Sequence, residues 1–230
     1  MHDYFASSVF AGVLLTLAAY FLGDAIRRKT GISLLNPILT GSAMVIVFLS
    51  VFRIDYAAYS QSSRIISFFL TPATVCLAVP LYEQFALLKK HKAAILAGIV
   101  SGVITSLVCV LALSFLFGLS HQDYVTLLPK SITNAIGMVV SEQLGGYPSI
   151  TVPVILITGT LGSVIAEPVL RLLHITEPVA RGVAIGTSSH AIGTTKAMEL
   201  GRIEGAMSSL SIVVSGILTV FGAYIFSFFL

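Results

Sequence analysis

Apolar runs of membrane length recur along almost the whole sequence, with short polar connectors between them. A helix of about 20 predominantly apolar residues crosses the roughly 30 Å hydrocarbon core of a bilayer. Inside that core every backbone N–H and C=O needs a partner within the chain, so such runs fold as helices. The composition agrees: 56% of the residues are hydrophobic and 10% are charged, against roughly 25% charged in soluble domains. We therefore predict an all-α polytopic membrane protein, folded as one membrane domain over residues 1–230.

About eight transmembrane segments are expected, some of them discontinuous. Two basic clusters, at 27–29 and 89–92, predict cytoplasmic connectors. If all eight segments cross, as we expect, both chain ends lie outside the cytoplasm. Segment 127–144 carries several polar side chains and has an alternative: if it only re-enters the membrane, Arg171 and Arg181 lie inside and the C-terminus is cytoplasmic. The expected segments are 4–23, 32–52, 65–88, 93–119, 127–144, 150–173, 179–200 and 206–230.

Prolines within two of these segments predict interrupted helices. A proline inside a helix removes a backbone hydrogen bond and clashes with the preceding turn. Thr71-Pro72 and Val79-Pro80 lie in segment 65–88, and Glu167-Pro168 lies in segment 150–173. We therefore expect a discontinuous helix in the first of these segments and an interruption in the second.

Short stretches recur in the same order along the chain, as in LLNPILTG at 34–41 and LLPKSITN at 127–134. We interpret them as an internal repeat of 32–119 and 127–201. Each copy would hold three membrane segments, so the second copy would be inverted relative to the first. Inverted repeats with broken helices that meet near the bilayer midplane are typical of secondary transporters. The alternative is that apolar sequences align by chance.

The segment 182–200 differs from the others because its middle is rich in glycine, hydroxyl and imidazole groups. Polar groups in hydrocarbon lose free energy unless they are satisfied, so these side chains must face protein or trapped water. Glycines in the same stretch allow close backbone approach and local unwinding. This combination predicts a transport site. The polar side chains are those of Thr187, Ser188, Ser189, His190, Thr194, Thr195 and Lys196.

Cationic and proton-carrying groups near the expected helix breaks favour a small anion, because broken helices also present partial positive charge at their N-termini. Lys130 lies beside Ser131 and Thr133 and is a candidate carboxylate-binding group; the alternative is a lysine that snorkels to the interface. His190 is a candidate for substrate binding or proton coupling, since an unperturbed imidazole titrates near neutral pH. Its alternative is a neutral structural imidazole bonded to a carbonyl.

Glu167 is the second proton-coupling candidate because a carboxylate inside a membrane is costly. An ion pair with Arg171, one helical turn away, explains the presence of Glu167 in this segment equally well. Asn36 and Asn134 each lie near the start of a segment and either donate to a substrate or cap a helix. The predicted substrate-binding set is Asn36, Thr71, Lys130, Ser131, Thr133, Asn134, Ser188, Ser189 and His190.

We expect no enzymatic activity and no catalytic residues. Ser189 and His190 are adjacent, neighbours along a helix do not face each other, and no GxSxG elbow is present. Cys76 and Cys109 lie in apolar runs, where free thiols behave as small hydrophobes, so no disulfide, metal site or cofactor is expected. The net charge of +3 gathers in connectors and gives no sign of nucleic-acid binding.

Several longer motifs resemble the LrgB/CidB family of membrane proteins, and the resemblance covers almost the whole chain. The motifs are LLNP at 34–37, FFLTPATVCLAVPLYEQ at 68–84, LLPKSIT at 127–133, SEQLGG at 141–146 and ARGVAIGTSSHAIGTTKAMELGRIEGAMSSL at 180–210. The resemblance implies a multi-pass protein of the bacterial cytoplasmic (inner) membrane, encoded beside a smaller membrane partner of the LrgA/CidA type.

Two functional descriptions follow from this resemblance. One is holin- or antiholin-like regulation of murein hydrolase activity and cell lysis; the other is carriage of small carboxylates such as pyruvate or, in plastids, glycolate and glycerate. The intramembrane polar residues favour carriage. We therefore predict a secondary transporter or facilitator of small carboxylates, with proton coupling as an option and the lysis regulator as the alternative. Expected partners are the carboxylate, the LrgA/CidA-type protein, the lipid bilayer and, as an option, a second copy of the chain.

Overall fold

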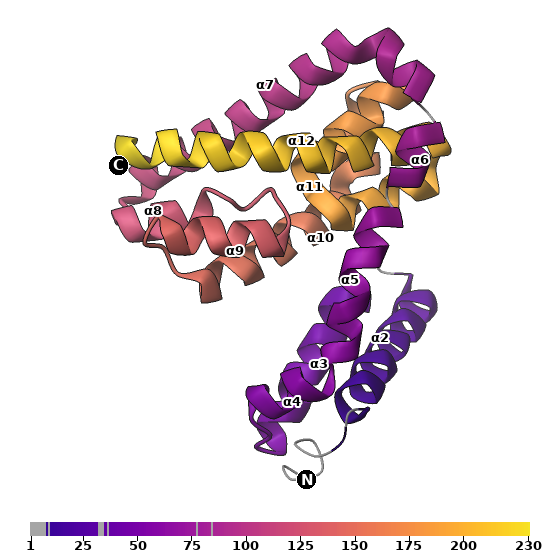
Figure 1. Ribbon diagram of the computed structural model, residues 1–230, viewed down its shortest axis with the longest axis vertical. Coiled ribbons are helices and arrows are strands. Elements are labelled where there is room, and N and C mark those ends of the chain that lie inside the picture. Colours follow the sequence, from indigo (N-terminus) through magenta and orange to yellow (C-terminus); the bar gives the residue numbers. More distant parts are fainter. Residues whose placement is uncertain (1–7, 9, 32–34, 36, 77, 84) are drawn as a thin grey trace. The chain divides into compact units, whose positions relative to one another are not determined.

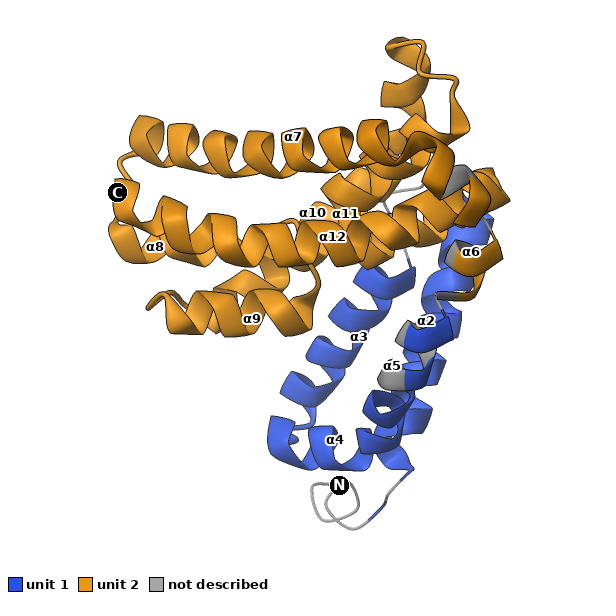
Figure 2. Cartoon of the chain, turned by 45° about the horizontal axis from the view of Figure 1, so that its top comes forward, with its two compact units in different colours: residues 1–76 blue, residues 77–230 orange. Residues whose placement is uncertain are grey.

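The computed structural model describes residues 8, 10–31, 35, 37–76, 78–83 and 85–230 (Figure 1). Every regular element within these ranges is a helix, which confirms the predicted all-α class. The chain divides into two compact units, Met1–Cys76 and Leu77–Leu230 (Figure 2). The single membrane domain and the internal repeat over 32–119 and 127–201 stay predictions.

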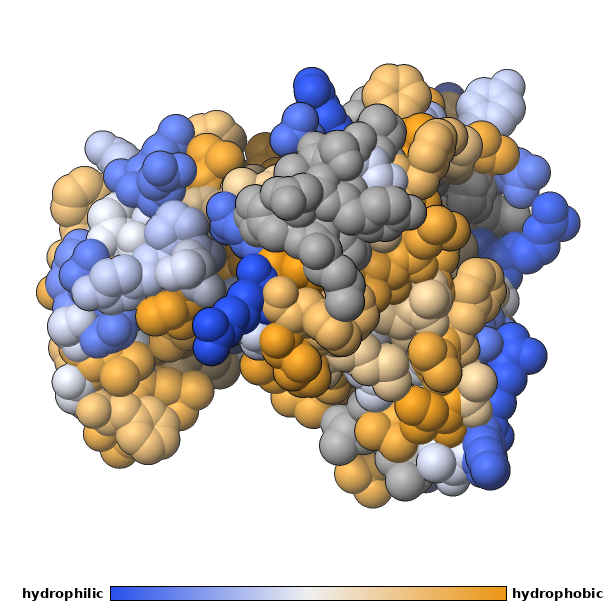
Figure 3. Space-filling model, turned by 90° about the horizontal axis from the view of Figure 1, so that it is seen from below, coloured by the Kyte–Doolittle hydropathy of each residue, from blue (hydrophilic) through white to orange (hydrophobic). Residues whose placement is uncertain are grey.

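Three helical stretches of the described chain are long and apolar enough to cross a membrane: Lys89–Phe117, Pro148–Leu172 and Arg202–Phe229. Many of their large apolar side chains are exposed, as in Phe117 and Leu172, and hydrophobic residues cover much of the face shown in Figure 3. Lipid is the solvent in which such a surface is stable. The chain is therefore a multi-pass membrane protein, while the expected number of about eight spans stays a prediction.

The first unit is built from helices that pack through small residues. Gly41 of α3 lies against the backbone of Ala19 in α2, and Gly23 of α2 lies against Pro37 and Thr40. Close approach of two helix backbones in a membrane depends on such residues. The described helices of this unit are α2 (Ala11–Thr30), α3 (Pro37–Val51), α4 (Tyr56–Ser62) and α5 (Arg64–Cys76).

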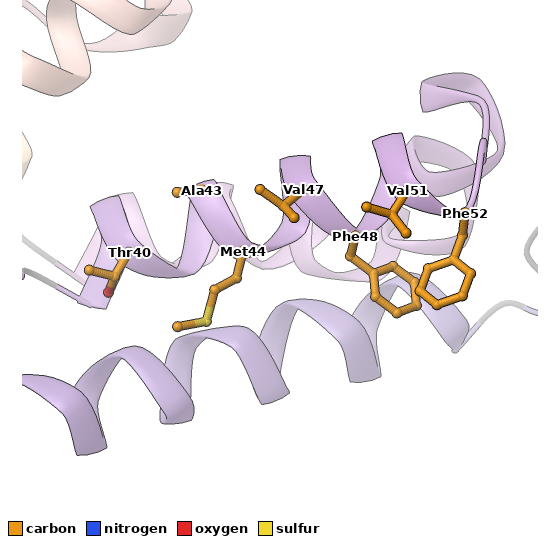
Figure 4. A pocket seen from close by; sticks show the side chains of 7 residues that line it. All are labelled: Thr40, Ala43, Met44, Val47, Phe48, Val51 and Phe52. Carbon is orange, nitrogen blue, oxygen red and sulfur yellow. The ribbon is translucent and has the colours of Figure 1, made fainter.

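One face of α3 forms the wall of an apolar cavity of about 580 Å³ (Figure 4). The rings of Phe48 and Phe52 lie 4.5 Å apart at one end of it. No charged side chain lines the cavity, so it has nothing with which to hold a small anion. The lining residues are Thr40, Ala43, Met44, Val47, Phe48, Val51 and Phe52.

The three prolines at which interruptions were expected all lie inside helices. Pro72 lies inside α5, which continues to Cys76, so the break expected at Thr71-Pro72 is wrong. Pro168 likewise lies inside the continuous helix α10 (Pro148–Leu172). Neighbouring groups and local adjustments can satisfy the backbone groups that a proline frees. Val79 and Pro80 lie inside the short helix α6 (Ala78–Glu83), so the break expected at this pair is absent as well. Residues 77 and 84, which flank α6, lie outside the described residues, so a discontinuity elsewhere within 65–88 stays a prediction.

The second unit is built around α7 (Phe85–Phe117) and α12 (Arg202–Phe226), which run side by side in the same direction (Figures 1 and 2). Buried residues recur every fourth position along one face of α7, from Ile95 to Leu107, and pack with Met207 of α12. The basic cluster 89–92 belongs to the first turns of α7 and is helical, although a connector was expected there. The remaining elements are α8 (His121–Leu127), α9 (Asn134–Gln143), α10, α11 (Pro178–Leu200) and the 3-10 helix η1 (Ser227–Phe229).

Segment 127–144 turns back on itself within the second unit. Thr126, just before the segment, accepts a hydrogen bond from the Tyr147 N–H at 2.8 Å, and its carbonyl accepts one from Thr151 Oγ1 at 3.0 Å. Both ends of the segment therefore lie at the same level. The ten residues of α9 rise by only about 15 Å. This path agrees with the re-entrant alternative: α8 and α9 form a hairpin whose turn contains Lys130.

Segment 179–200, for which a crossing helix was expected, is a second hairpin. His190 has φ 41° and ψ −139°, so the helical path reverses there. Gly182 in the first arm lies against Glu204 of α12, and Met198 in the second arm lies against Gly205. Both ends of α11 therefore meet the same turn of α12. The expected crossing is wrong because packing of both arms on α12 stabilises a return.

The two hairpins enter unit 2 from opposite ends. The α8–α9 hairpin lies at the end where α7 finishes, since Tyr124 donates a hydrogen bond to the Phe226 carbonyl at 2.8 Å. The α11 hairpin lies at the opposite end, where α12 begins. Basic side chains gather at this second end, and the positive-inside rule therefore predicts that it faces the cytoplasm. They belong to Lys89, Lys90, Lys92, Arg171, Arg181 and Arg202.

This orientation combines features of both topologies considered from the sequence. If the basic end faces the cytoplasm, the C-terminus at the other end of α12 is expected outside it, as for full crossing. Arg171 and Arg181 are then expected on the cytoplasmic side, as if segment 127–144 re-enters. With this orientation, Arg171 and Arg181 are no longer expected outside the cytoplasm, where the positive-inside rule disfavours them.

Candidate functional site

The turns of the two hairpins line one cavity of about 480 Å³ within the second unit. The first hairpin contributes Lys130, and the second contributes Ser188 and Ser189. One face of α10 forms the opposite wall. The remaining lining residues are Thr158, Leu161, Gly162, Ile165, Ala166, Val169, Leu170, Ala184 and Ile185. Three of the predicted substrate-binding residues, which lie nearly 60 positions apart in the sequence, therefore meet at one site.

Lys130 reaches the middle of the membrane-length helix α7. Its ammonium donates to Ser131 Oγ at 3.0 Å and to Ser106 Oγ at 3.3 Å. Ser106 lies 11 positions before Phe117, which is roughly 16 Å along the helix axis. The contact with Ser106 favours an internal lysine over one that snorkels to the interface.

The Lys130 ammonium has no carboxylate partner in the described part of the chain. The ion pairs that these residues form involve other lysines and arginines. Hydroxyl groups solvate an ammonium without neutralising its charge, and an unpaired charge in a low-dielectric site attracts a counter-ion strongly. The cavity is therefore suited to an anion.

The second hairpin presents its hydroxyl groups at the same place. Ser188 Oγ and Ser189 Oγ lie 3.1 Å apart, and Ser188 Oγ also donates to the Ala184 carbonyl at 2.8 Å. Ser189 fits against Gly162 of α10 so closely that a β-carbon at Gly162 would overlap its hydroxyl. A glycine at this position is thus required for the hairpin turn to approach α10.

His190 lies in the contact between the hairpin and α10, outside the cavity lining. Its Nε2 is 3.0 Å from the Ile155 carbonyl oxygen, and the side chain is 3% exposed. Gly159 makes room for the imidazole, since a β-carbon there would lie 2.6 Å from His190 Cε1. This contact is the structural alternative considered for His190, an imidazole bonded to a carbonyl. Substrate binding and proton coupling by His190 stay predictions.

Glu167 is also outside the cavity lining. It forms ion pairs with Arg171 at 2.5 Å and with Lys196 of the second hairpin arm at 3.3 Å. The pairing with Arg171 that was considered from the sequence is present. Lys196 adds a link between α10 and α11 that the sequence did not predict. Proton coupling through Glu167 stays a prediction.

The other predicted binding residues lie in several places. Ser131 is 3.0 Å from Ser106 and supports Lys130. Thr133 precedes α9 without a side-chain capping bond, and Asn134 is the exposed first residue of that helix, so neither lines the cavity. Thr71 lies in α5 of the first unit. Asn36 lies outside the described residues.

Sequence reasoning missed two features of this site. Gly159 and Gly162 of α10 accept the turn of the second hairpin, and their spacing of three along an expected helix is a signal for close packing. Arg181 and Glu204 form a largely buried ion pair at 3.3 Å that joins the hairpin to α12. Both residues lie near the ends of expected segments, where exposed charges are normal, so the sequence held no signal for the pair.

These features define a class of protein: a helical membrane protein with a largely apolar cavity, to which two helical hairpins contribute a lysine and two serines. The comparisons with known proteins then specify the family. Residues 16–229 match the LrgB-like family, and the chain belongs to this family. No solved structure matches the chain.

Curated relatives cover nearly the whole chain. It is 38% identical over 207 residues to the holin-like protein CidB of Staphylococcus epidermidis, with 90% of each chain covered. It is 35% identical to the antiholin-like protein LrgB of Bacillus mycoides, with 91% of each covered, and 34% identical to the uncharacterized protein YxaC of Bacillus subtilis, with 90% of each covered. Two of these names agree with the holin- or antiholin-like alternative predicted from the sequence, and none of them mentions transport.

Proposed function

We propose that this chain is a carrier or facilitator of small carboxylates in the bacterial cytoplasmic membrane, with no chemical conversion of the solute. The observation that carries the proposal is the Lys130 ammonium, which is bonded to hydroxyl groups alone and lines a cavity shared with Ser188 and Ser189. A carboxylate would neutralise this ammonium and accept from the serine hydroxyls.

The geometry also fits passage through the membrane. The two hairpin turns meet inside the bilayer from opposite ends of the unit, as the broken helices of secondary transporters do. Neither His190 nor Glu167 lines the cavity, so proton coupling is an option within the proposal, which an imposed pH gradient would test.

Uptake of labelled pyruvate or glycolate into proteoliposomes tests the carrier. Lys130→Ala removes a charged hydrogen-bond donor worth about 1.5–3 kcal/mol, so uptake at low substrate concentration should fall at least about tenfold. Lys90→Ala is the matched control, because Lys90 is exposed in the first turns of α7. If no protein sample moves either acid, the carrier proposal is wrong; if both variants retain full uptake, the assignment of the binding site to Lys130 is wrong.

A second candidate is a regulator of murein hydrolase activity and cell lysis that acts with an LrgA/CidA-type partner. The names of the holin-like and antiholin-like relatives favour it. The same Lys130→Ala variant separates the two in cells that lack their own copy. Lysis control that survives the substitution while uptake is lost assigns the two activities to different parts of the protein, and joint loss assigns them to one site.

A further inference from the structure

Most of the cavity wall is apolar, although the part that the hairpin turns form is polar. Lys130, Thr158, Ser188 and Ser189 supply the polar groups of the lining. Beyond them the lining is aliphatic along α10 and the first arm of α11. Among the described residues that line the cavity, Lys130 is the one that carries a charge.

The aliphatic wall is elongated. Leu161, Ile165 and Val169 line it at spacings of four residues, so they follow one face of α10. The distance from Leu161 to Val169 is about 12 Å at the helical rise of 1.5 Å per residue. Across from them lie Ala184 and Ile185 of α11. The wall therefore forms a trough that leads away from the Lys130 ammonium.

A three-carbon acid would leave most of this trough empty. The cavity volume of about 480 Å³ equals that of roughly 16 water molecules, at about 30 Å³ each in the liquid. Hydroxyl groups on a solute would have no polar partner along the aliphatic wall, and a second carboxylate would lie there without a cation. Both would lose hydration without compensation.

We propose that the preferred ligand is a monocarboxylate with a short linear or branched aliphatic tail, held with its carboxylate at Lys130 and its tail along Ile165 and Val169. This inference rests on the proposed carrier function and narrows its substrate class. A hydroxy acid or a dicarboxylate of similar size is a poorer ligand for the same cavity.

The expected preference follows from the burial of the tail. Each fully buried methylene adds about 0.8 kcal/mol, or about a fourfold gain in affinity. Ile165 and Val169 are 52% and 41% exposed, so the trough is open along one side and part of this gain is lost. We therefore expect 4-methyl-2-oxopentanoate, which carries three more carbons than pyruvate, to compete about tenfold more effectively than unlabelled pyruvate.

Competition against labelled pyruvate uptake in proteoliposomes tests the proposal, with 4-methyl-2-oxopentanoate, butyrate, glycerate and malate as competitors. The order expected is the two tailed acids first, then glycerate, then malate. Val169→Phe fills the trough, so it should reduce competition by the tailed acids, relative to competition by unlabelled pyruvate, at least about fivefold. Ile157→Phe is the matched control, because Ile157 is exposed on the same helix and does not line the cavity.

The outcomes distinguish this inference from the function on which it rests. Pyruvate uptake that depends on Lys130, with tailed acids no better than pyruvate and Val169→Phe behaving like Ile157→Phe, overturns the substrate class and leaves the carrier intact. Stronger competition by malate or glycerate overturns it as well. Absence of uptake for every acid, tailed acids included, removes the carrier and the inference together.

Discussion

Adding a single methyl group at Gly186 should separate the second hairpin from α12. Gly186 lies in the first hairpin arm, and a β-carbon there would lie 2.7 Å from Ser208 Cα and 2.8 Å from Ser211 Cβ. Real β-carbons essentially never approach other heavy atoms so closely. Ser208 Cα belongs to the backbone of α12, so no side-chain rotation relieves the overlap, and the helices must move apart.

The size of the effect is a balance of two contributions. Overpacking of a close contact costs about 1–3 kcal/mol, while replacing glycine by alanine within a helix contributes about 1 kcal/mol of stability. Gly186→Ala should therefore lower the free energy of unfolding by up to about 2 kcal/mol. For a chain of this length each kcal/mol corresponds to roughly 2–4 °C, so the Tm in detergent should fall by up to about 8 °C.

Gly216→Ala provides a matched control in α12. The nearest atom to a β-carbon at Gly216 is Ile136 Cδ1 at 3.5 Å, an ordinary contact, so this variant should be neutral or slightly more stable than the wild type. Thermal unfolding of the three purified proteins, followed by circular dichroism, measures the difference. If the Gly186→Ala protein is as stable as Gly216→Ala, the close packing of the first hairpin arm on α12 is refuted.

Two further substitutions test other contacts of the second unit. Arg181→Leu leaves Glu204 buried without its partner and should destabilise the protein by about 3 kcal/mol. The Arg181→Leu/Glu204→Leu double variant should recover most of that loss of stability in the same thermal melts. Equal losses in the single and double variants would contradict the buried ion pair. Tyr124→Phe removes the donor to the Phe226 carbonyl and should cost about 1 kcal/mol. Burial raises the pKa of Tyr124 to about 12, so the difference in ultraviolet absorbance between wild type and Tyr124→Phe should titrate near pH 12; a difference that titrates near pH 10 would contradict its burial.

The class of the fold and part of the site follow from the sequence because they depend on composition and on single residues. A polar group in a membrane-length segment must be turned inward wherever the helix lies, which is why Lys130 could be joined with Ser188 and Ser189 before any coordinates. The same reasoning does not distinguish a binding role from a structural one. His190 is turned inward as expected, but its imidazole bonds to the Ile155 carbonyl outside the cavity.

The paths of two segments could not be read from the sequence, because length and hydropathy are alike for a crossing helix and for a hairpin. In α11 the turn occurs at His190, which is neither glycine nor proline, and no local signal separates the 23 residues of this element into two arms. Packing on α12 decides the outcome. Pro72 shows the converse, a strong local signal for a break that the surrounding helix overrides.

The meeting of the hairpin turns part-way through the bilayer has an electrical consequence. A solute anion held at Lys130, as proposed, would have crossed roughly half of the membrane potential from either water phase, because the Lys130 ammonium contacts Ser106 well inside α7. One elementary charge that crosses the full potential changes energy by about 2.3 kcal/mol per 100 mV, so half of that path corresponds to about 1.2 kcal/mol. Occupancy from the cytoplasmic and external solutions would then respond to voltage in opposite directions, by about sevenfold per 100 mV.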